Sequence, residues 1–365
     1  MTKTAAGQEV LSTRALNRAT LARQLLLRRA RRPALDATEH LLGLQAQNPK
    51  PPYHALAARL ADFDPDELSG LLERREVVRL PAMRSTIHLM SVEDALVLRP
   101  FSQPALDREL KMFRKGLDGV DLDRVVALAA ERCTGAGMPL KVLGEELAQE
   151  WPDADRLALK IAARVLLPLV QTTPRGLWGQ GGQVALATLR SWVGRDMAAV
   201  AEPDVDALVR RYLAAFGPAS VKDMQTWAGV TRLRPAFERL RGELRTFRDP
   251  SGVELFDLPD APRPGPDVPA PPRFLPEYDN VLLSHADRTR VVPPEFRGRT
   301  WQGNSAYCVF LVDGFLRGIW RVEEGTMVVE PFTPLSRAER DAVEAEAARV
   351  LEPAAPGGGV RIAQA

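Results

Sequence analysis

The chain of 365 residues is too long for one ordinary hydrophobic core, and its 45% hydrophobic and 26% charged residues predict two to four folded domains. Its formal net charge of +2 gives no overall indication of a nucleic-acid partner. Two isolated cysteines and four histidines without metal-ligand spacing argue against disulfides, metals and cofactors. The lack of a long apolar stretch or a signal-peptide core predicts a cytoplasmic protein that contacts no membrane.

The first 35 residues are strongly basic and contain the first predicted helix, over 16–27. They carry eight Lys or Arg residues, among them Lys3, against Glu9 alone, and the densest part is 28–32. Such a run is a solvated helix face about as often as it is a phosphate-binding patch, so both interpretations stay open.

Three successive segments share one predicted layout of helices followed by two short strands. In the first, a helix begins at Asp36, with Glu39 completing a capping box, and it ends near Gln47 before a group of prolines. The remaining elements are predicted helices at 53–60 and from Asp64, and strands at 77–80 and 86–89. This layout is typical of a helix-turn-helix with a small wing.

The second and third segments repeat this order. The second has predicted helices at 121–133, 139–150 and 155–167, and strands at 169–172 and 184–187. The third has helices at 205–216, 220–228 and 232–241, and strands at 244–248 and 253–257. We therefore expect winged-helix domains at 1–118, which includes the basic N-terminal helix, at 119–200 and at 201–258.

The last third of the chain changes character. Seven prolines within 259–273 predict an extended, semi-rigid linker. A small β-rich unit with a closing helix is then predicted over 274–352, and residues 353–365 are expected to be disordered. Its predicted elements are strands at 281–283, 307–312, 316–322 and 327–331, a hairpin turn at Asp313-Gly314, and a helix from Ser336, capped by Glu339, to Leu351.

A helix-turn-helix places its second helix in the DNA major groove, where Lys222 on the 220–228 helix could act as a donor. The winged helix also serves as a protein-interaction module, so the fold alone does not establish DNA binding. A transcriptional regulator and a protein-interaction scaffold therefore stay open as alternatives.

The segment Gln45-Ala46-Gln47 is the strongest candidate for chemistry. Its two glutamines flank a small apolar residue where the predicted helix ends, so their amides can converge on one point. Such a pair can hold and orient a water molecule, although neutral amides cannot usefully take up a proton. The alternative is that both amides satisfy backbone groups at the helix end.

Five motifs in this order resemble the bacterial helix-turn-helix DNA glycosylases, most closely the branch typified by the azinomycin-resistance glycosylase, over residues 14–351. The motifs are Gln45-Ala46-Gln47, Arg84–Leu89, Gly217–Ser220 with Trp227, Leu275–Asn280 and Ser284–Arg288. The resemblance implies an α+β fold of three tandem winged-helix domains, followed by a small C-terminal β-barrel with a closing helix, which together form a concave DNA-binding surface. It implies that Gln45 and Gln47 are catalytic.

The resemblance further implies an enzyme that hydrolyses the N-glycosidic bond of bulky N7-alkylated purines in double-stranded DNA. Because no lysine lies in the motif to form a Schiff base with the sugar, we expect the enzyme to be monofunctional, and from the self-contained concave surface we expect a monomer. A sister branch carries Asp at the second motif position, so Gln47 favours the branch linked to self-resistance against DNA-alkylating natural products, several of whose members unhook interstrand crosslinks. An N7-alkylated purine is a cation that departs as a neutral base, so an amide pair that positions water agrees with this chemistry. The candidate DNA contacts are Arg28, Arg29, Arg84, His88, Lys222 and Arg288.

Overall fold

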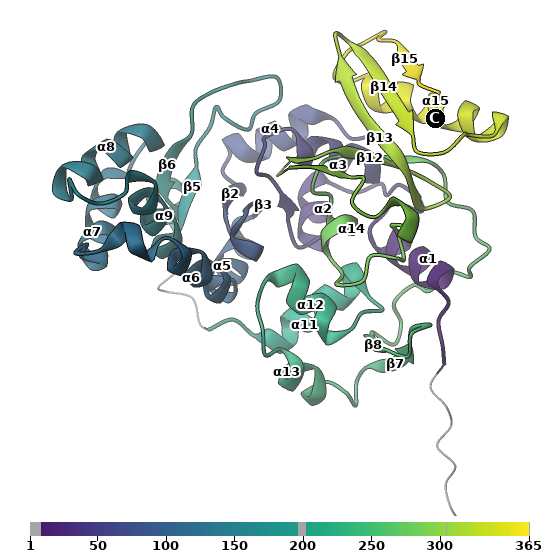
Figure 1. Cartoon of the computed structure of the whole chain (residues 1–365), viewed down its shortest axis with the longest axis horizontal. Helices are drawn as coiled ribbons and strands as arrows, with labels where there is room; N and C mark the ends of the chain where they lie inside the picture. Colours follow the sequence, from purple (N-terminus) through teal and green to yellow (C-terminus); the bar gives the residue numbers. More distant parts are fainter. Residues whose placement is uncertain (1–8, 196–201, 304, 365) are drawn as a thin grey trace, which may run out of the picture.

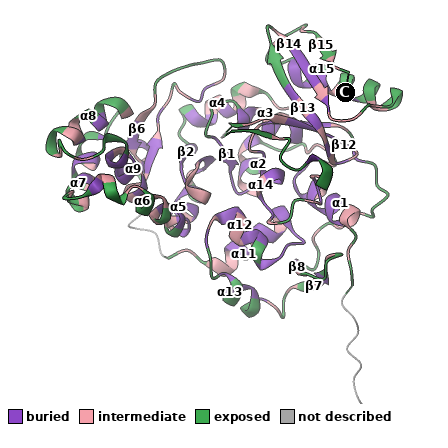
Figure 2. Ribbon diagram, in the orientation of Figure 1, coloured by how far each residue is buried: buried purple, intermediate pink, exposed green. Residues whose placement is uncertain are grey.

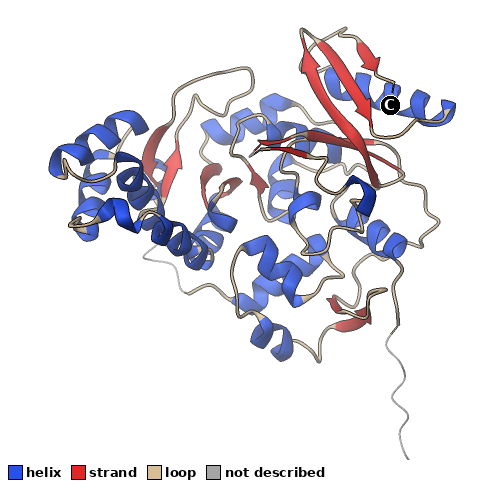
Figure 3. Cartoon of the chain, in the orientation of Figure 1, coloured by secondary structure: helices blue, strands red, loops and turns tan. Residues whose placement is uncertain are grey.

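The computed structural model describes residues 9–195, 202–303 and 305–364, which form a mixed α/β fold (Figures 1 and 3). Lys3 and the outer ends of the predicted ranges 1–118 and 119–200 lie outside the described residues. In the part of the chain that is described, no helix is long and apolar enough to span a membrane.

The first unit, residues 34–91, contains three helices and a three-stranded sheet whose strands pair in the order β1-β3-β2. Its elements are α2 (Ala34–His40), β1 (Leu44–Gln45), α3 (Pro51–Arg59), α4 (Pro65–Glu73), β2 (Val77–Pro81), the 3₁₀ turn η1 (Met83–Ser85) and β3 (Ile87–Ser91). The predicted cap at Asp36 is wrong, because α2 begins after Pro33 and the Ala34 N–H donates to Glu67 instead, at 2.7 Å.

The second unit, residues 122–188, repeats this topology, with strands in the order β4-β6-β5. Its elements are α7 (Leu122–Arg132), β4 (Met138–Pro139), α8 (Leu140–Glu150), α9 (Arg156–Leu166), β5 (Leu169–Gln171) and β6 (Ala185–Thr188). The helices and the last two strands lie where the sequence predicted them, whereas the short β4 was not predicted.

The third unit, residues 205–257, follows the same order of elements. They are α11 (Val205–Phe216), α12 (Val221–Ala228), α13 (Arg234–Arg239), β7 (Arg245–Arg248) and β8 (Glu254–Asp257). Ala219 bridges Phe256 in the place of a first strand. The predicted capping box of Ser220 and Asp223 at the start of α12 is confirmed.

Helices that were not predicted join these units, and one continuous apolar core fixes their arrangement. The connecting elements are α5 (Val92–Phe101), α6 (Gln103–Met112), the 3₁₀ turn η2 (Arg114–Leu117) and α10 (Leu189–Val193). The core includes Leu80 of the first unit, Val170 of the second, and Tyr212, Phe216 and Trp227 of the third. Figure 2 shows this buried interior where the units meet, with exposed surface on the outer helices.

The C-terminal unit, residues 273–362, is an open five-stranded sheet in the order β15-β14-β13-β12-β9. Its elements are β9 (Arg273–Leu275), β12 (Cys308–Val312), β13 (Phe315–Glu323), β14 (Thr326–Pro331), the helix α15 (Arg337–Leu351) and β15 (Val360–Ile362). The expected closed barrel is wrong, because within the described residues the edge strands β9 and β15 do not pair with each other. The capping box of Ser336 and Glu339 and the Asp313-Gly314 turn, with φ of 49° and 81°, are confirmed.

Two further expectations for this region are wrong. Residues 281–283 form a helix, α14 (Asn280–Leu283), instead of a strand, because the Asp279 carboxylate caps the Val281 N–H at 3.1 Å. The tail expected to be disordered contains β15, which pairs in parallel with β14 from Val360 opposite Met327. A small hairpin that was not predicted, β10 (Trp301–Gln302) and β11 (Ser305–Ala306), follows the 3₁₀ turn η4 (Pro294–Phe296).

The basic N-terminal helix α1 (Thr13–Arg23) is shorter than predicted and is used for internal packing. Its residue Arg18 donates to the Val268 carbonyl of the proline-rich linker at 2.6 Å and forms an ion pair with Asp313. Arg23 is fully buried against Asp257 of the third unit at 2.6 Å. Much of the positive charge of this helix therefore joins the linker, the third unit and the C-terminal sheet.

Candidate active site

Gln45 lies on a strand, and the expectation of a helix end at this position is wrong. The chain leaves α2 at His40 and turns through Leu42 and Gly43, whose φ angles of 57° and 85° are left-handed. A side chain at Gly43 would place its Cβ 3.0 Å from the Leu89 carbonyl oxygen, so glycine permits the close pairing of β1 with β3. Gln45 consequently lies opposite His88 in this sheet.

The Gln45 side chain is only 7% exposed, and its carbonyl is bound by an arginine. Nη2 of Arg84 donates to Oε1 of Gln45 at 2.8 Å and lies 3.4 Å from Nε2 of His88. Nη1 of Arg84 donates to the backbone carbonyl of Trp227 in the third unit. The orientation of the Gln45 amide is therefore set by a contact between two units.

Gln47 is exposed, and its Oε1 accepts a hydrogen bond from the Ile87 N–H at 3.2 Å. The Ala46 N–H donates to the Ile87 carbonyl at 2.7 Å, and the chain bends from Gln47 onward. Both glutamines are thus tied to the β3 segment, Gln45 opposite His88 and Gln47 at the Ile87 N–H. The convergence of the two amides on one point stays a prediction.

Arg84 and His88 form a partly dehydrated polar group behind Gln45. Burial, with the like charge of Arg288 as a smaller cause, lowers the pKa of Arg84 to about 10, so it stays cationic at neutral pH. Burial lowers the pKa of His88 to about 3, which keeps its ring neutral. Because Nδ1 of His88 lies 2.9 Å from the Thr86 carbonyl, this nitrogen donates, and Nε2 is left as an acceptor facing Arg84.

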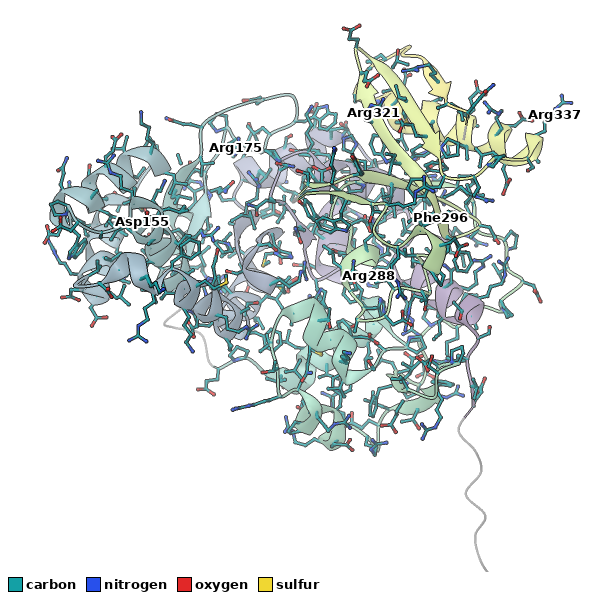
Figure 4. The ribbon with its side chains drawn as sticks, in the orientation of Figure 1. Asp155, Arg175, Arg288, Phe296, Arg321 and Arg337 are labelled. Atoms are coloured by element: carbon teal, nitrogen blue, oxygen red, sulfur yellow. The ribbon has the colours of Figure 1, made fainter. Side chains whose placement is uncertain are left out.

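A second arginine holds the backbone between the glutamines. Arg79 is 1% exposed, and its Nη2 donates to the Ala46 carbonyl at 2.8 Å. Its Nη1 lies 3.4 Å from the carbonyl of Arg175, a residue that is labelled in Figure 4. Arg175 belongs to the long loop between β5 and β6 of the second unit. Tyr53 anchors the same loop by donating to the Gly176 carbonyl at 2.6 Å.

A cavity of about 460 Å³ lies in the C-terminal part of the chain, between the α14 segment and the β10–β11 hairpin. Aromatic rings line it, and those of Tyr278 and Trp301 meet edge to face with centroids 5.5 Å apart. Glu277, which precedes Tyr278, accepts from Nδ2 of Asn48 at 2.8 Å and so connects this wall to the residue after Gln47. The sequence prediction missed this wall, although a cluster of Tyr278, Trp301 and Tyr307 could have signalled it.

The six candidate DNA contacts fall into two groups. Arg28, Lys222 and Arg288 are exposed and form no ion pair with a described residue. Arg288 lines the aromatic cavity, and Figure 4 shows it near the junction of the units. The other three, Arg29, Arg84 and His88, are engaged internally.

Arg29 forms an ion pair with Glu346, and His88 is only 2% exposed. The donors of Arg84 bind Gln45 and Trp227, so they do not face a phosphate in this structure. Among the described residues, no group of His, Cys, Asp and Glu side chains could hold a metal ion.

Comparison with known proteins gives one consistent result. An interstrand DNA cross-link repair glycosylase from Streptomyces sahachiroi is 27% identical over 363 residues, covering 90% of this chain and 92% of the relative. The solved structure of the Streptomyces sahachiroi DNA glycosylase AlkZ covers 97% of this chain and 100% of its own, with a TM-score of 0.79 at 23% identity, a likeness that shows the fold. The family described as DNA glycosylase AlkZ-like matches residues 38–352. These matches favour a glycosylase over a transcriptional regulator, and the chain belongs to the AlkZ-like DNA glycosylase family.

Proposed function

We propose that this DNA glycosylase hydrolyses the N-glycosidic bond of bulky N7-alkylated purines, with Gln45 and Gln47 as its catalytic residues. The observation that carries the proposal is that both glutamine carbonyls are held against the β3 segment and its preceding turn, that of Gln45 by Arg84 and that of Gln47 by the Ile87 N–H. Because all these groups come from one chain, we propose that the monomer is active.

The proposed reaction needs no strong acid. The C1′–N9 bond breaks, its electron pair neutralises the cationic purine, and the sugar becomes an oxocarbenium-like cation. The oxygen of a water molecule then bonds to C1′ and releases a proton to solvent. Each glutamine carbonyl has two lone pairs. Arg84 occupies one lone pair of Gln45, and the Ile87 N–H occupies one lone pair of Gln47. The second lone pair of each carbonyl can accept from this water or lie against the positive sugar.

The described lining of the cavity favours a monofunctional hydrolase for large lesions. The lining residues include no lysine, which a covalent Schiff-base step would require. A flipped normal base can enter a closed pocket, but a bulky base cannot. A cavity that is open to solvent on one side can accept the bulky base. The name of the relative as a cross-link repair enzyme supports interstrand crosslinks as a further substrate.

We further propose that the three repeated units are winged-helix domains that together bind duplex DNA. Their shared order of helix, first strand or bridge, two helices and a hairpin supports this interpretation. Arg28, Lys222 and Arg288 are the proposed phosphate contacts, because their charges face solvent. Arg29, Arg84 and His88 are instead assigned internal roles.

A duplex with one bulky N7-alkylguanine tests the function. We expect alkali-labile cleavage at the lesion, and we expect Gln45→Ala and Gln47→Ala to reduce the single-turnover rate by about 100-fold or more while DNA binding persists. Gln183→Ala, which removes an exposed glutamine in the second unit, serves as the matched control. Efficient release of unmodified purines, or full activity in both active-site variants, would contradict the proposal.

A further inference from the structure

Two arginines from the first unit contact the Gln45-Ala46-Gln47 segment at different atoms. We propose that Arg84 and Arg79, here called the arginine clamp, are positioning residues that fix the reactive geometry of the glutamine pair. This inference rests on the proposed catalytic role of Gln45 and extends it to residues that do not touch the substrate.

Arg84 fixes the orientation of the Gln45 amide. Its Nη2 donates to Oε1, so the amide cannot flip without placing its NH₂ group against a guanidinium. Arg84 is itself held at two further points, the Trp227 carbonyl and Nε2 of His88. Its φ of 55° is left-handed, an unfavourable conformation for a residue with a side chain, and it aims the guanidinium at Gln45.

Arg79 fixes the backbone of the same segment. Among the described residues its partners are the backbone carbonyls of Ala46 and Arg175, and it forms no ion pair there. Burying a cation without a carboxylate is costly, and an apolar side chain of similar volume would be a less costly way to fill this space. Its place at the centre of the motif therefore favours a role in geometry over a role in stability.

The clamp treats the two glutamines differently. Gln45 is buried and bound by a charged donor, whereas Gln47 is exposed and its Oε1 accepts from the neutral Ile87 N–H. Charged hydrogen bonds are shorter and stronger than neutral ones, so Gln45 is the fixed member and Gln47 the adjustable one. Loss of Arg84 should therefore act on the reaction through Gln45.

A double-mutant cycle on single-turnover excision of an N7-alkylguanine tests this dependence. We expect Arg84→Met to reduce the rate constant by about 10- to 100-fold, with little change in DNA affinity. In a Gln45→Ala background, the same substitution should change the rate by less than about twofold, because its target is already absent. An equal loss in both backgrounds would show a general structural effect and overturn the inference.

Control variants separate positioning from loss of a buried arginine. Arg99 is 2% exposed and donates to Val165, and burial lowers its pKa to about 10, as for Arg79. Arg99→Met removes a buried arginine outside the motif and should therefore cause no specific loss of rate, whatever its effect on stability. Arg79→Lys keeps a donor for Ala46 and should recover much of the activity lost in Arg79→Met. Equal losses of rate in Arg99→Met and Arg79→Met at matched folded fractions would contradict the clamp.

A spectroscopic measurement needs no catalysis. The side-chain amide signals of Gln45, assigned by their disappearance in Gln45→Ala, should shift in Arg84→Met and stay in place in Arg99→Met. If the Gln45 signals do not shift in Arg84→Met, the arginine clamp is overturned, even when Gln45→Ala shows no measurable excision. Full activity of Gln45→Ala would instead refute the proposed function, so the two failures are distinguishable.

Discussion

A close contact between two backbones supports the active site, and it can be perturbed by one methyl group. Gly229 ends α12 in the left-handed conformation, with φ of 70° and ψ of 20°. A Cβ atom at this position would lie 2.9 Å from Cα and 3.0 Å from N of Arg84. Because both neighbours are backbone atoms, they cannot give way by rotating a side chain, and we predict that Gly229→Ala displaces Arg84 from Gln45.

The chain contains a matched control for this substitution. Gly194 ends α10 with φ of 73° and ψ of 12°, and a Cβ atom there would meet no described atom within 4 Å. Alanine in this conformation costs about 1–2 kcal/mol at either position, so the two variants should lose similar stability from backbone strain alone. The difference between them isolates the contact with Arg84, whose displacement by a few tenths of an ångström should lower the excision rate about tenfold or more.

Single-turnover excision and thermal unfolding of both variants measure the two effects separately. We expect Gly194→Ala to keep the excision rate of the parent protein after a modest fall in unfolding temperature. We expect Gly229→Ala to lose rate at a temperature where it is fully folded. If the two variants excise the lesion equally fast, the Gly229–Arg84 contact does not control the position of Gln45.

Three further outcomes follow from the contacts described above. Asp279→Ala removes both carboxylate oxygens, at 2.7 and 2.8 Å, from the fully buried Arg59 guanidinium, and should destabilise the protein by about 3–5 kcal/mol, which a lower thermal midpoint would reveal. Arg288→Gln should weaken binding to all duplexes and lower the slope of log affinity against log salt by about one, as measured in a salt series; an unchanged slope would remove it from the DNA interface. The pKa of His88 is about 3 in the fold against an ordinary value of 6.5, so the unfolded chain takes up the proton first as pH falls. The contribution of this residue to stability is complete above pH 6.5, and the free energy of unfolding should fall by about 2 kcal/mol at pH 5. A free energy of unfolding that does not change between pH 7.5 and 5 would contradict the burial of His88 as a neutral ring.

The repeated architecture could be predicted because its signals are local. Prolines, helix caps and the Asp313-Gly314 turn act within a few residues, so the helices of the second and third units and the closing helix lie close to their predicted ranges. The failures have a long-range cause. The β1 strand exists because β3 pairs with it from more than forty residues away, and β15 is ordered by its parallel pairing with β14.

The sequence indicated the glutamine pair, but it did not predict which residues orient the two amides. Arg84 and His88 were assigned to DNA from their place on or beside the predicted first wing, with a buried, hydrogen-bonded His88 as the alternative. The sequence does not show that the Arg84 side chain binds Gln45 and lies against His88. Arg79 carried no signal, since an arginine in a predicted strand normally points to solvent. A buried cation is recognised only when the structure shows which carbonyls surround it.

One member of the site could not be recognised from any side chain. The acceptor that anchors Arg84 is the backbone carbonyl of Trp227, which is near enough only because the first and third units share a single apolar core. The orientation of Gln45 thus depends on how the rings of Trp227, Tyr212 and Phe216 pack against one another. If Gln45 is catalytic as proposed, packing between the units contributes to catalysis, because a shift of α12 would move the Trp227 carbonyl, Arg84 and the Gln45 amide together.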